Sequence, residues 1–144
     1  MSDFDLRCRE LYEYIEALVE RFVVLQSGIL DKAASNLSFQ QIKVVGHVGK
    51  FQPCTMSELA ERTRLSMSTM TGIVDKLVAG KLVRRYRSDA DRRVVNVKLT
   101  ARGMEIYEME VKNHLELAKA MLNALPEPEQ LQLIALLKKI NSTV

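Results

Sequence analysis

The sequence predicts a mainly α-helical protein with a minor β component: a winged helix-turn-helix unit carried between long N- and C-terminal helices. Three features of its 144 residues support this fold class. Residues 55–79 read as two short helices joined by a tight turn, and residues 80–100 read as a basic two-stranded hairpin. Both ends of the chain, residues 4–33 and 101–144, carry apolar residues at helical spacing.

The helices of the central unit are marked by their capping residues. Thr55 and Glu58 form the T-x-x-E pattern of a capping box, and Ser66 is a second N-cap. Upstream, Ser38 and Gln41 begin a helix that runs to about Lys50. In the helix after Ser66, apolar residues recur at helical spacing and predict one buried stripe: Met70, Ile73, Val74, Leu77 and Val78.

The opposite face of that helix is small and polar. It carries Ser68, Thr69, Gly72, Asp75, Lys76 and Ala79. Short hydroxyl side chains and a glycine let a helix backbone approach base-pair edges, although a mid-helix glycine costs roughly 1 kcal/mol against alanine. This face suits a helix in the major groove of DNA. An ordinary solvated face is the alternative interpretation.

The segment after this helix is basic. Gly80 is expected to end the helix as its C′ residue, residues 82–87 and 93–99 alternate as strands, and residues 88–91 supply a turn. Residues 55–100 contain ten Lys and Arg against five Asp and Glu, a net +5 in a chain of net +3. Positive charge is concentrated where a polyanion would bind. A solvated basic hairpin is the alternative.

These residues resemble the MarR (multiple antibiotic resistance regulator) family of transcription factors. The resemblance rests on L-S-M-S-T-M-T-G-I-V-D-K-L at 65–77, on G-K-L-V-R-R at 80–85, and on a wing signature, D-x-R-x-x-x-x-x-L-T, which begins at Asp91. The helices on either side extend it over nearly the whole chain. It implies a regulator that binds double-stranded DNA, in which Asp75 or Asp91 braces a wing arginine such as Arg93.

The terminal helices hold more apolar residues than one small wing domain needs. Thr100 can cap a long helix to about Ala124, and Pro126 and Pro128 separate it from a last helix at 129–141. We expect both ends to pack together and against a second copy, with a monomeric core as the alternative. A homodimer would set two recognition helices about 34 Å apart on a palindromic operator. The expected parts of the single domain 1–144 are the DNA-binding part 36–100 and the dimerisation parts 4–33 and 101–144.

Hydroxyl, glycine and basic residues form the expected DNA contact set. Residues beside the turn would hold phosphates, and Arg92 or Arg93 would enter an A·T-rich minor groove. The full set is Arg62, Arg64, Ser66, Ser68, Thr69, Thr71, Gly72, Lys76, Arg84, Arg85, Arg87, Arg92 and Arg93.

The resemblance also implies how such a protein is regulated. Members of the family release DNA when a small, often anionic aromatic effector enters a crevice between the dimerisation and DNA-binding parts. Tyr12, Phe22, Phe39 and Phe51 are the candidate lining residues, and a place in the hydrophobic core is the alternative.

Other MarR-like proteins sense peroxide or zinc. The peroxide sensors use a cysteine near the start of the first helix, where Cys8 lies with Tyr12 one turn further on as a hydrogen-bond donor to its thiolate; a plain surface cysteine is the alternative. The zinc proteins use histidines at places corresponding to His47 and His114. Without a clustered ligand pair, these two histidines predict no metal site.

The sequence disfavours several other classes. It has no Gly-rich phosphate loop, H-E-x-x-H or G-x-S-x-G motif, so we expect no enzyme and no cofactor. No apolar run approaches the ~20 residues of a membrane span, the N-terminus is unlike a signal peptide, and the two cysteines predict no disulfide framework. We therefore expect a cytoplasmic repressor, released from its operator by a small-molecule or redox signal. An architectural DNA binder and a helical protein-interaction module are the rival hypotheses.

Overall fold

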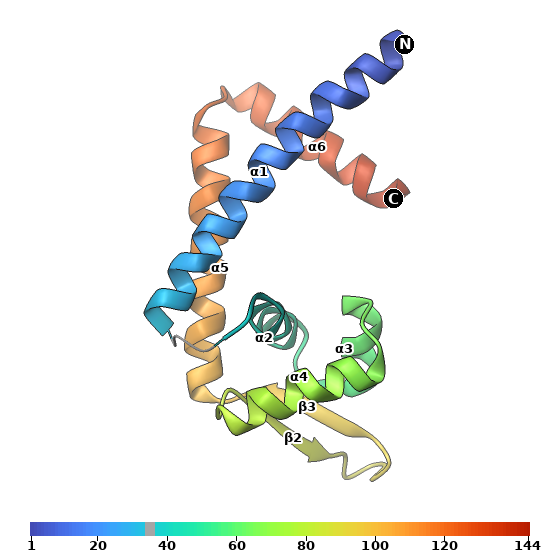
Figure 1. The fold of residues 1–144 in the computed structure, drawn as a ribbon, viewed down its shortest axis with the longest axis vertical. Coiled ribbons are helices and arrows are strands. Elements are labelled where there is room, and N and C mark those ends of the chain that lie inside the picture. The colour runs from blue at the N-terminus through green and yellow to red at the C-terminus, as the bar shows by residue number, and fades with distance from the viewer. Residues whose placement is uncertain (34–36) are drawn as a thin grey trace.

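The computed structural model describes residues 1–33 and 37–144, and side chains over 1–24 and 37–144. The expected domain boundary at residue 36 and the side chains of residues 25–33 in the first predicted helix lie outside the described residues. In chain order the elements are α1 (Asp3–Ala33), α2 (Phe39–Phe51), β1 (Cys54–Thr55), α3 (Met56–Thr63), α4 (Met67–Ala79), β2 (Val83–Arg87), β3 (Val95–Leu99), α5 (Ala101–Asn123) and α6 (Glu127–Thr143). Helices α1, α5 and α6 form a stalk, and the remaining elements gather at its lower end (Figure 1).

The four predicted N-caps are confirmed. Ser38 and Thr55 each form a full capping box, with Gln41 and Glu58 respectively. The Ser66 hydroxyl accepts from the Thr69 amide, and the Thr100 hydroxyl accepts from that of Gly103. These side chains satisfy amides that the first turn of a helix leaves without intrahelical partners.

The predicted end of α4 is wrong in one respect. Gly80 has a right-handed backbone, and the left-handed residue is Lys81, with φ of 59°. The Leu82 amide donates to the Leu77 carbonyl and the Lys81 amide to that of Val78, the two bonds of a Schellman motif. Because the motif is one residue further along than expected, lysine takes the conformation that glycine usually supplies. Helix α3 ends in the same way at Arg64, with φ of 56°.

The wing sheet has three strands where the sequence predicted two. Strand β1 pairs antiparallel with β3, and β3 pairs antiparallel with β2, giving the order β1-β3-β2. A two-residue strand is too short for a periodic pattern, which is why it was missed. β2 and β3 are shorter than predicted, and residues 88–94 form the connection between them.

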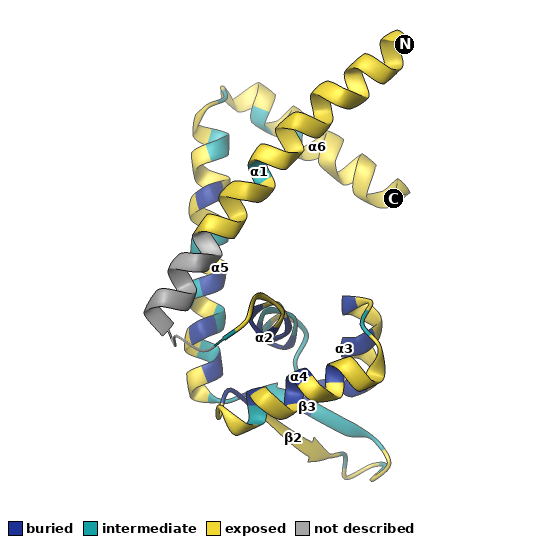
Figure 2. Cartoon of the chain, in the orientation of Figure 1, coloured by how far each residue is buried: buried dark blue, intermediate teal, exposed yellow. Residues whose placement is uncertain are grey.

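The hydrophobic core lies in the winged part of the molecule. Dark blue residues gather on α2, α3, α4 and the lower half of α5 (Figure 2). The sheet adds buried Val83, Val97 and Leu99. Ile42, Leu59, Met70, Leu77 and Val97 are among its fully buried members. Of the predicted α4 stripe, Met70, Ile73, Val74 and Leu77 are buried and Val78 is half-buried.

Helix α6 begins earlier than predicted. It spans Glu127–Thr143 rather than 129–141, with Pro126 as its N-cap and Pro128 inside its first turn. Proline is tolerated there because first-turn amides have no intrahelical acceptor, so Pro128 starts this helix rather than breaking one. None of the residues of α6 is buried.

Two glycines let α2 and α5 pack closely. A Cβ built on Gly46 would overlap the carboxyl group of Glu110, and one built on Gly49 would overlap the ring of Tyr107. The two glycines are three residues apart on α2, as the two α5 residues are on theirs, so one face of α2 receives two successive side chains of α5. This contact joins the winged part to the stalk.

Candidate nucleic-acid interface

The exposed face of α4 lies at the end of the molecule away from both termini (Figure 1). Ser66, Ser68 and Thr69 are exposed, and their hydroxyls form a small cluster: Ser66 donates to Thr69 at 2.9 Å and lies 3.1 Å from the Ser68 oxygen. The Thr71 hydroxyl is exposed and donates back to the Met67 carbonyl at 2.8 Å. Lys76 is exposed one helical turn beyond Gly72. The face therefore presents short polar groups and one cation.

Gly72 has no packing role within the described structure. A Cβ placed there would meet nothing within 4 Å among the described atoms. The protein's own packing would accept alanine, which is the better helix former by roughly 1 kcal/mol. The small residue therefore leaves room for something outside the chain.

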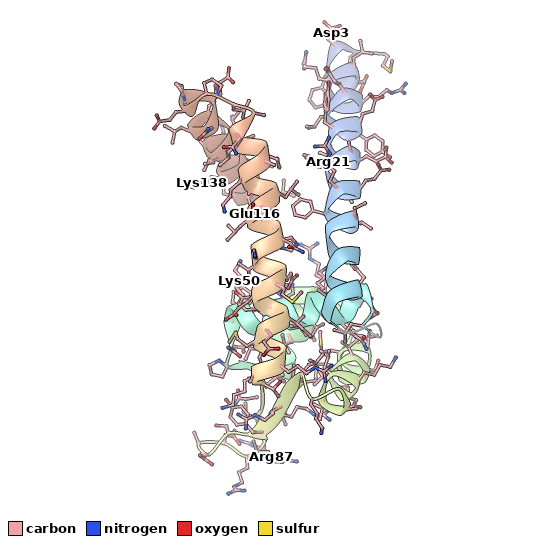
Figure 3. The ribbon with its side chains drawn as sticks, turned by 90° about the vertical axis from the view of Figure 1, so that its left-hand side faces the viewer. Asp3, Arg21, Lys50, Arg87, Glu116 and Lys138 are labelled. Carbon is pink, nitrogen blue, oxygen red and sulfur yellow. The ribbon has the colours of Figure 1, made fainter. Side chains whose placement is uncertain are left out.

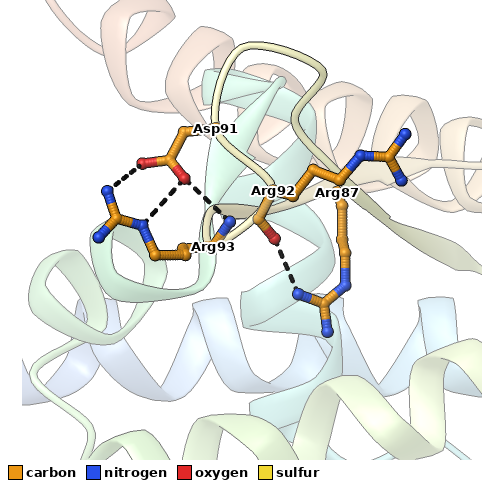
Figure 4. Close-up of polar contacts among 4 residues, drawn as sticks. All are labelled: Arg87, Asp91, Arg92 and Arg93. Carbon is orange, nitrogen blue, oxygen red and sulfur yellow. Dashed lines mark hydrogen bonds and ion pairs between the residues drawn. The ribbon is translucent and has the colours of Figure 1, made fainter.

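Arginine side chains contribute to holding the wing loop, residues 88–94 (Figure 4). Asp91 accepts from the Arg93 amide at 3.0 Å and from the Arg93 guanidinium at 3.2 Å through both of its oxygens. These bonds lower the pKa of Asp91. From the neighbouring strand, Arg87 donates to the Arg92 carbonyl at 2.8 Å.

The wing arginines therefore differ in what holds them. Figure 4 shows the Arg92 side chain pointing away from Asp91 and Arg93. Among the residues that the structure describes, its guanidinium has no hydrogen-bond or ion-pair partner, whereas Arg93 is paired and Arg87 is engaged. The sequence left open which arginine enters the groove and which is braced. In the structure, Arg93 is paired with Asp91, and the Arg92 guanidinium is unpaired among the described residues.

A second ion pair ties the recognition helix to the wing. Arg85 of β2 contacts Asp75 of α4 at 2.6 Å. The expectation that Asp75 or Asp91 pairs with a wing arginine is confirmed for both residues. This ion pair joins α4 to the hairpin and holds the Arg85 guanidinium beside the exposed face of α4.

The arginines of β2 lie on different faces of the sheet. Arg85 and Arg87 share the side of buried Val83, while Arg84 lies on the outer side directly opposite Lys98. Lys98 lies over the ring of Tyr86, 5.4 Å from its centroid. The sequence analysis did not single out Tyr86 or Lys98. The alternation along β2 and β3 would have placed both beside Arg84.

A cavity of about 230 Å³ lies between α2 and α5. It is lined by Lys43, Gly46, His47, Lys50, Tyr107, Glu110, Val111 and His114. Three buried side-chain atoms lack a hydrogen-bond partner among the described residues: His47 Nδ1, Glu110 Oε2 and His114 Nε2. Unsatisfied polar atoms are rare in folded proteins, so three around one cavity indicate a place for a polar guest.

Burial changes the charge state of this cluster. It raises the pKa of Glu110, which is 7% exposed, to about 7. Burial also lowers the pKa of His114, and it lowers that of His47 together with the nearby charges of Lys43, Lys50 and Arg62. Near neutral pH both imidazoles are therefore uncharged, and Glu110 is divided between its protonated and its ionised form. The sequence places Glu110 one turn before His114, and its burial follows from its position four residues after Ile106 on the apolar side of α5.

Two of the four candidate effector residues lie beside this cavity. Phe22 packs edge-on against His114 with ring centroids 5.4 Å apart, and Phe51 stacks on His47 at 6.1 Å. Phe39 is exposed, and Tyr12 is exposed and donates to Glu16 at 3.0 Å. Tyr12 and Phe39 are not among the residues that line this cavity, and the grouping of all four around one effector crevice stays a prediction.

The structure also places the candidate redox residue, Cys8, and the two histidines considered for metal binding. Cys8 is an exposed free thiol on α1, and the hydroxyl of Tyr12 is directed to Glu16 rather than to the sulfur. His47 and His114 both face the cavity, yet the described residues hold no group of three His, Cys, Asp or Glu side chains that could bind a metal ion. Within the described part of the chain, no helix is both long and apolar enough to cross a membrane.

Comparison with solved structures supports this fold. Streptococcus pneumoniae FabT in complex with DNA matches with a TM-score of 0.84 at 20% identity, over 94% of this chain and 95% of FabT. Staphylococcus aureus MarR in complex with salicylate and kanamycin matches with a TM-score of 0.77 at 21% identity, over 97% of this chain and 93% of that one. Both likenesses extend over the stalk and the winged part together.

Sequence comparison supplies the family. Residues 35–94 match the sequence profile of the MarR family. PecS of Dickeya dadantii (strain 3937), an HTH-type transcriptional regulator, is 31% identical over 127 residues, which cover 85% of this chain and 76% of PecS. With its capped helix pair, braced wing and helical stalk, the chain belongs to the MarR family of DNA-binding transcriptional regulators.

Proposed function

We propose that this protein is a homodimeric repressor that binds a palindromic operator and releases it when a small molecule binds. The observation that carries the proposal is the joint surface of α4 and the wing. A small, polar helix face with an open glycine lies beside a wing whose arginines are braced by Asp75 and Asp91. Such a face fits a major groove, and the wing fits the adjacent minor groove.

Dimerisation is supported by the stalk. Helix α6 exposes Leu131, Ile134, Leu136, Leu137 and Ile140, and the described part of α1 exposes further large apolar side chains. Contiguous apolar surfaces of this kind are typical of interfaces between protein chains. A two-fold axis through the stalk would give two recognition helices, and one DNA turn, about 34 Å, is the spacing that a palindromic site requires.

The wing arginines receive different roles in this proposal. Arg92 enters the minor groove, while Arg93 keeps the loop in shape through Asp91. Replacing Arg92 with Ala should therefore weaken operator binding through a lost DNA contact. Replacing Arg93 with Ala should weaken it through a disordered loop, with the dimer still folded. Arg9→Ala is a matched charge control, since α1 begins at the end of the molecule opposite the wing, as the positions of Asp3 and Arg87 show (Figure 3).

Release by an effector is supported by the cavity between α2 and α5. Its lysines suit an anionic group, and the uncharged imidazoles of His47 and His114 and the carboxyl group of Glu110 offer hydrogen bonds to a polar ring. The solved structure of S. aureus MarR holds salicylate, a small aromatic anion. We propose the same class of effector here. The ligand would act by binding one spacing of the two recognition helices better than another.

The test is selection of genomic DNA fragments by the purified protein at low and at physiological salt. A few fragments that share an inverted repeat and survive the higher salt would support a specific dimer. A reporter gene placed behind such a site should then be silenced by the protein and activated on its deletion. Broad recovery that disappears with salt would instead indicate an architectural binder, and no recovery at either salt would favour a protein-interaction module.

A further inference from the structure

The ring of Phe51 joins two parts of the molecule. Phe51 is the last residue of α2 and is half-buried against the winged core. The guanidinium carbon of Arg62, in the last turn of α3, lies 3.8 Å from the centroid of this ring. The ring also stacks on His47 with an interplanar angle of 18°. One aromatic side chain therefore touches both a basic residue of the helix-turn-helix and a residue that lines the α2–α5 cavity.

The contact orients Arg62 without using its hydrogen-bond donors. A guanidinium stacked on an aromatic face keeps its five N–H groups free in its own plane. The Arg62 side chain has no hydrogen bond or ion pair to any other described residue. It is also exposed, and it lies shortly before the turn that leads into α4. Holding such a side chain in one place removes part of the entropy that would otherwise be lost when it binds a phosphate.

We propose that Phe51 is a positioning residue for DNA binding: it holds Arg62 toward a phosphate and links that contact to His47 in the α2–α5 cavity. This inference rests on the proposed function, which assigns Arg62 to a phosphate. It deepens that function by naming a route from cavity to DNA. A guest that displaces the His47 ring disturbs Phe51, and a displaced Phe51 releases Arg62.

The test is a pair of double-mutant cycles read by operator affinity over a range of salt concentrations. Arg62→Gln should weaken binding on the order of tenfold and reduce the slope of log affinity against log salt by about 0.9, the value for one lost phosphate contact. Phe51→Leu keeps an apolar side chain but removes the stacking face. It should weaken binding by about two- to fivefold and lower the same slope. His47→Ala should act in the same direction with a smaller effect.

The decisive variants combine two changes. If Phe51 and His47 act through Arg62, neither Phe51→Leu nor His47→Ala weakens binding further once Arg62 is Gln. Arg64→Gln is the matched control, because Arg64 lies two residues away and has no contact with the ring. Its effect should add fully to that of Phe51→Leu. Phe51→Tyr should restore near-normal affinity and slope, and thermal unfolding of each variant separates lost contacts from lost fold.

Two results would overturn the proposal in distinguishable ways. Additive effects of Phe51→Leu and Arg62→Gln would mean that Phe51 only supports the core, and the assignment of Arg62 to a phosphate would stand. An Arg62→Gln variant with unchanged affinity and slope would remove Arg62 from the DNA interface. That second result would correct the proposed function itself, and the positioning role would fall with it.

Discussion

The winged part and the stalk differ in how they treat apolar side chains. The winged part closes a core of its own, in which Ile42, Leu59 and Leu77 are fully buried. In the stalk, α6 buries none of its residues, and Leu137 is 53% exposed. The winged part thus buries its apolar side chains within the chain, whereas the stalk leaves apolar helix faces exposed. The difference supports the proposal that the stalk is half of an interface between two copies, whereas the winged part closes a core of its own.

The largest predicted effect tests the stalk. Leu137→Asp would place a charge within the proposed dimer interface, where an unpaired buried charge costs about 3–5 kcal/mol. We expect the dimer dissociation constant to rise by at least about 100-fold, measured by analytical ultracentrifugation. Lys139→Gln changes the net charge equally and should leave the dimer intact. A Leu137→Asp protein that stays dimeric would mean that α6 is covered by something other than a second copy.

The next effect tests the winged core. Leu77→Ala removes a fully buried side chain from α4 and should lower the free energy of unfolding by about 2–5 kcal/mol, measured by urea denaturation. If the winged part is its own folding unit, hydrogen exchange should quicken across α2–α4 and the sheet and change little in α6. Equal acceleration in both regions would argue against two units.

An intermediate effect concerns Glu110 at the contact between the two regions. Its pKa is about 7 in the folded chain against 4.5 as the ordinary value, so the folded protein holds an extra proton between those pH values. Stability contributed by this group is therefore lost as pH rises from 4.5 to 7. Glu110→Gln should be more stable than the natural protein at pH 8 by about 2 kcal/mol, after allowing for water at the open side of the cavity, and equal to it at pH 4.

The control for Glu110 is its exposed neighbour. Glu108→Gln should leave the pH dependence of the melting temperature unchanged, because Glu108 is exposed. If Glu110→Gln shows the same decline in stability between pH 4.5 and 7 as the natural protein, then another group is responsible for it.

The smallest predicted effect concerns Gly72, on the exposed face of α4 in the winged part. Gly72→Ala should raise stability by roughly 1 kcal/mol in chemical denaturation, because the new methyl meets nothing and alanine favours helix. Operator affinity should fall nevertheless, because the methyl would occupy space that DNA needs. Unchanged affinity would show that the backbone at residue 72 does not approach the bases.

The sequence was most informative where a local rule acts alone. Hydrogen bonding between neighbouring residues sets a helix start, so Ser38, Thr55, Ser66 and Thr100 could all be recognised as N-caps. The pairing of β1 with β3 could not be recognised, because its partner residues are 41 to 43 positions apart and only the folded chain brings them together.

The site followed the same division. The basic face was readable from residue type and spacing, and the bracing carboxylates Asp75 and Asp91 were implied by the resemblance to the MarR family. The sequence could not show which wing arginine is paired and which is unpaired, because that depends on where the folded loop directs the side chain of Arg92. The cavity was also out of reach, because it needs α2 and α5 to be packed against each other before Glu110, His47 and His114 meet.

The glycines packed against α5 carry a practical consequence for anyone who engineers this protein. Gly-to-Ala exchange in helices is a common way to raise thermostability. Here the same exchange would have opposite outcomes along one chain. It should help at Gly72, where the methyl is free, and harm at Gly46 and Gly49, where it would collide with Glu110 and Tyr107. A stabilised variant should therefore be designed from the contacts at each glycine. Alanine substitutions chosen by helix propensity alone would place methyl groups between α2 and α5 and push the two helices apart.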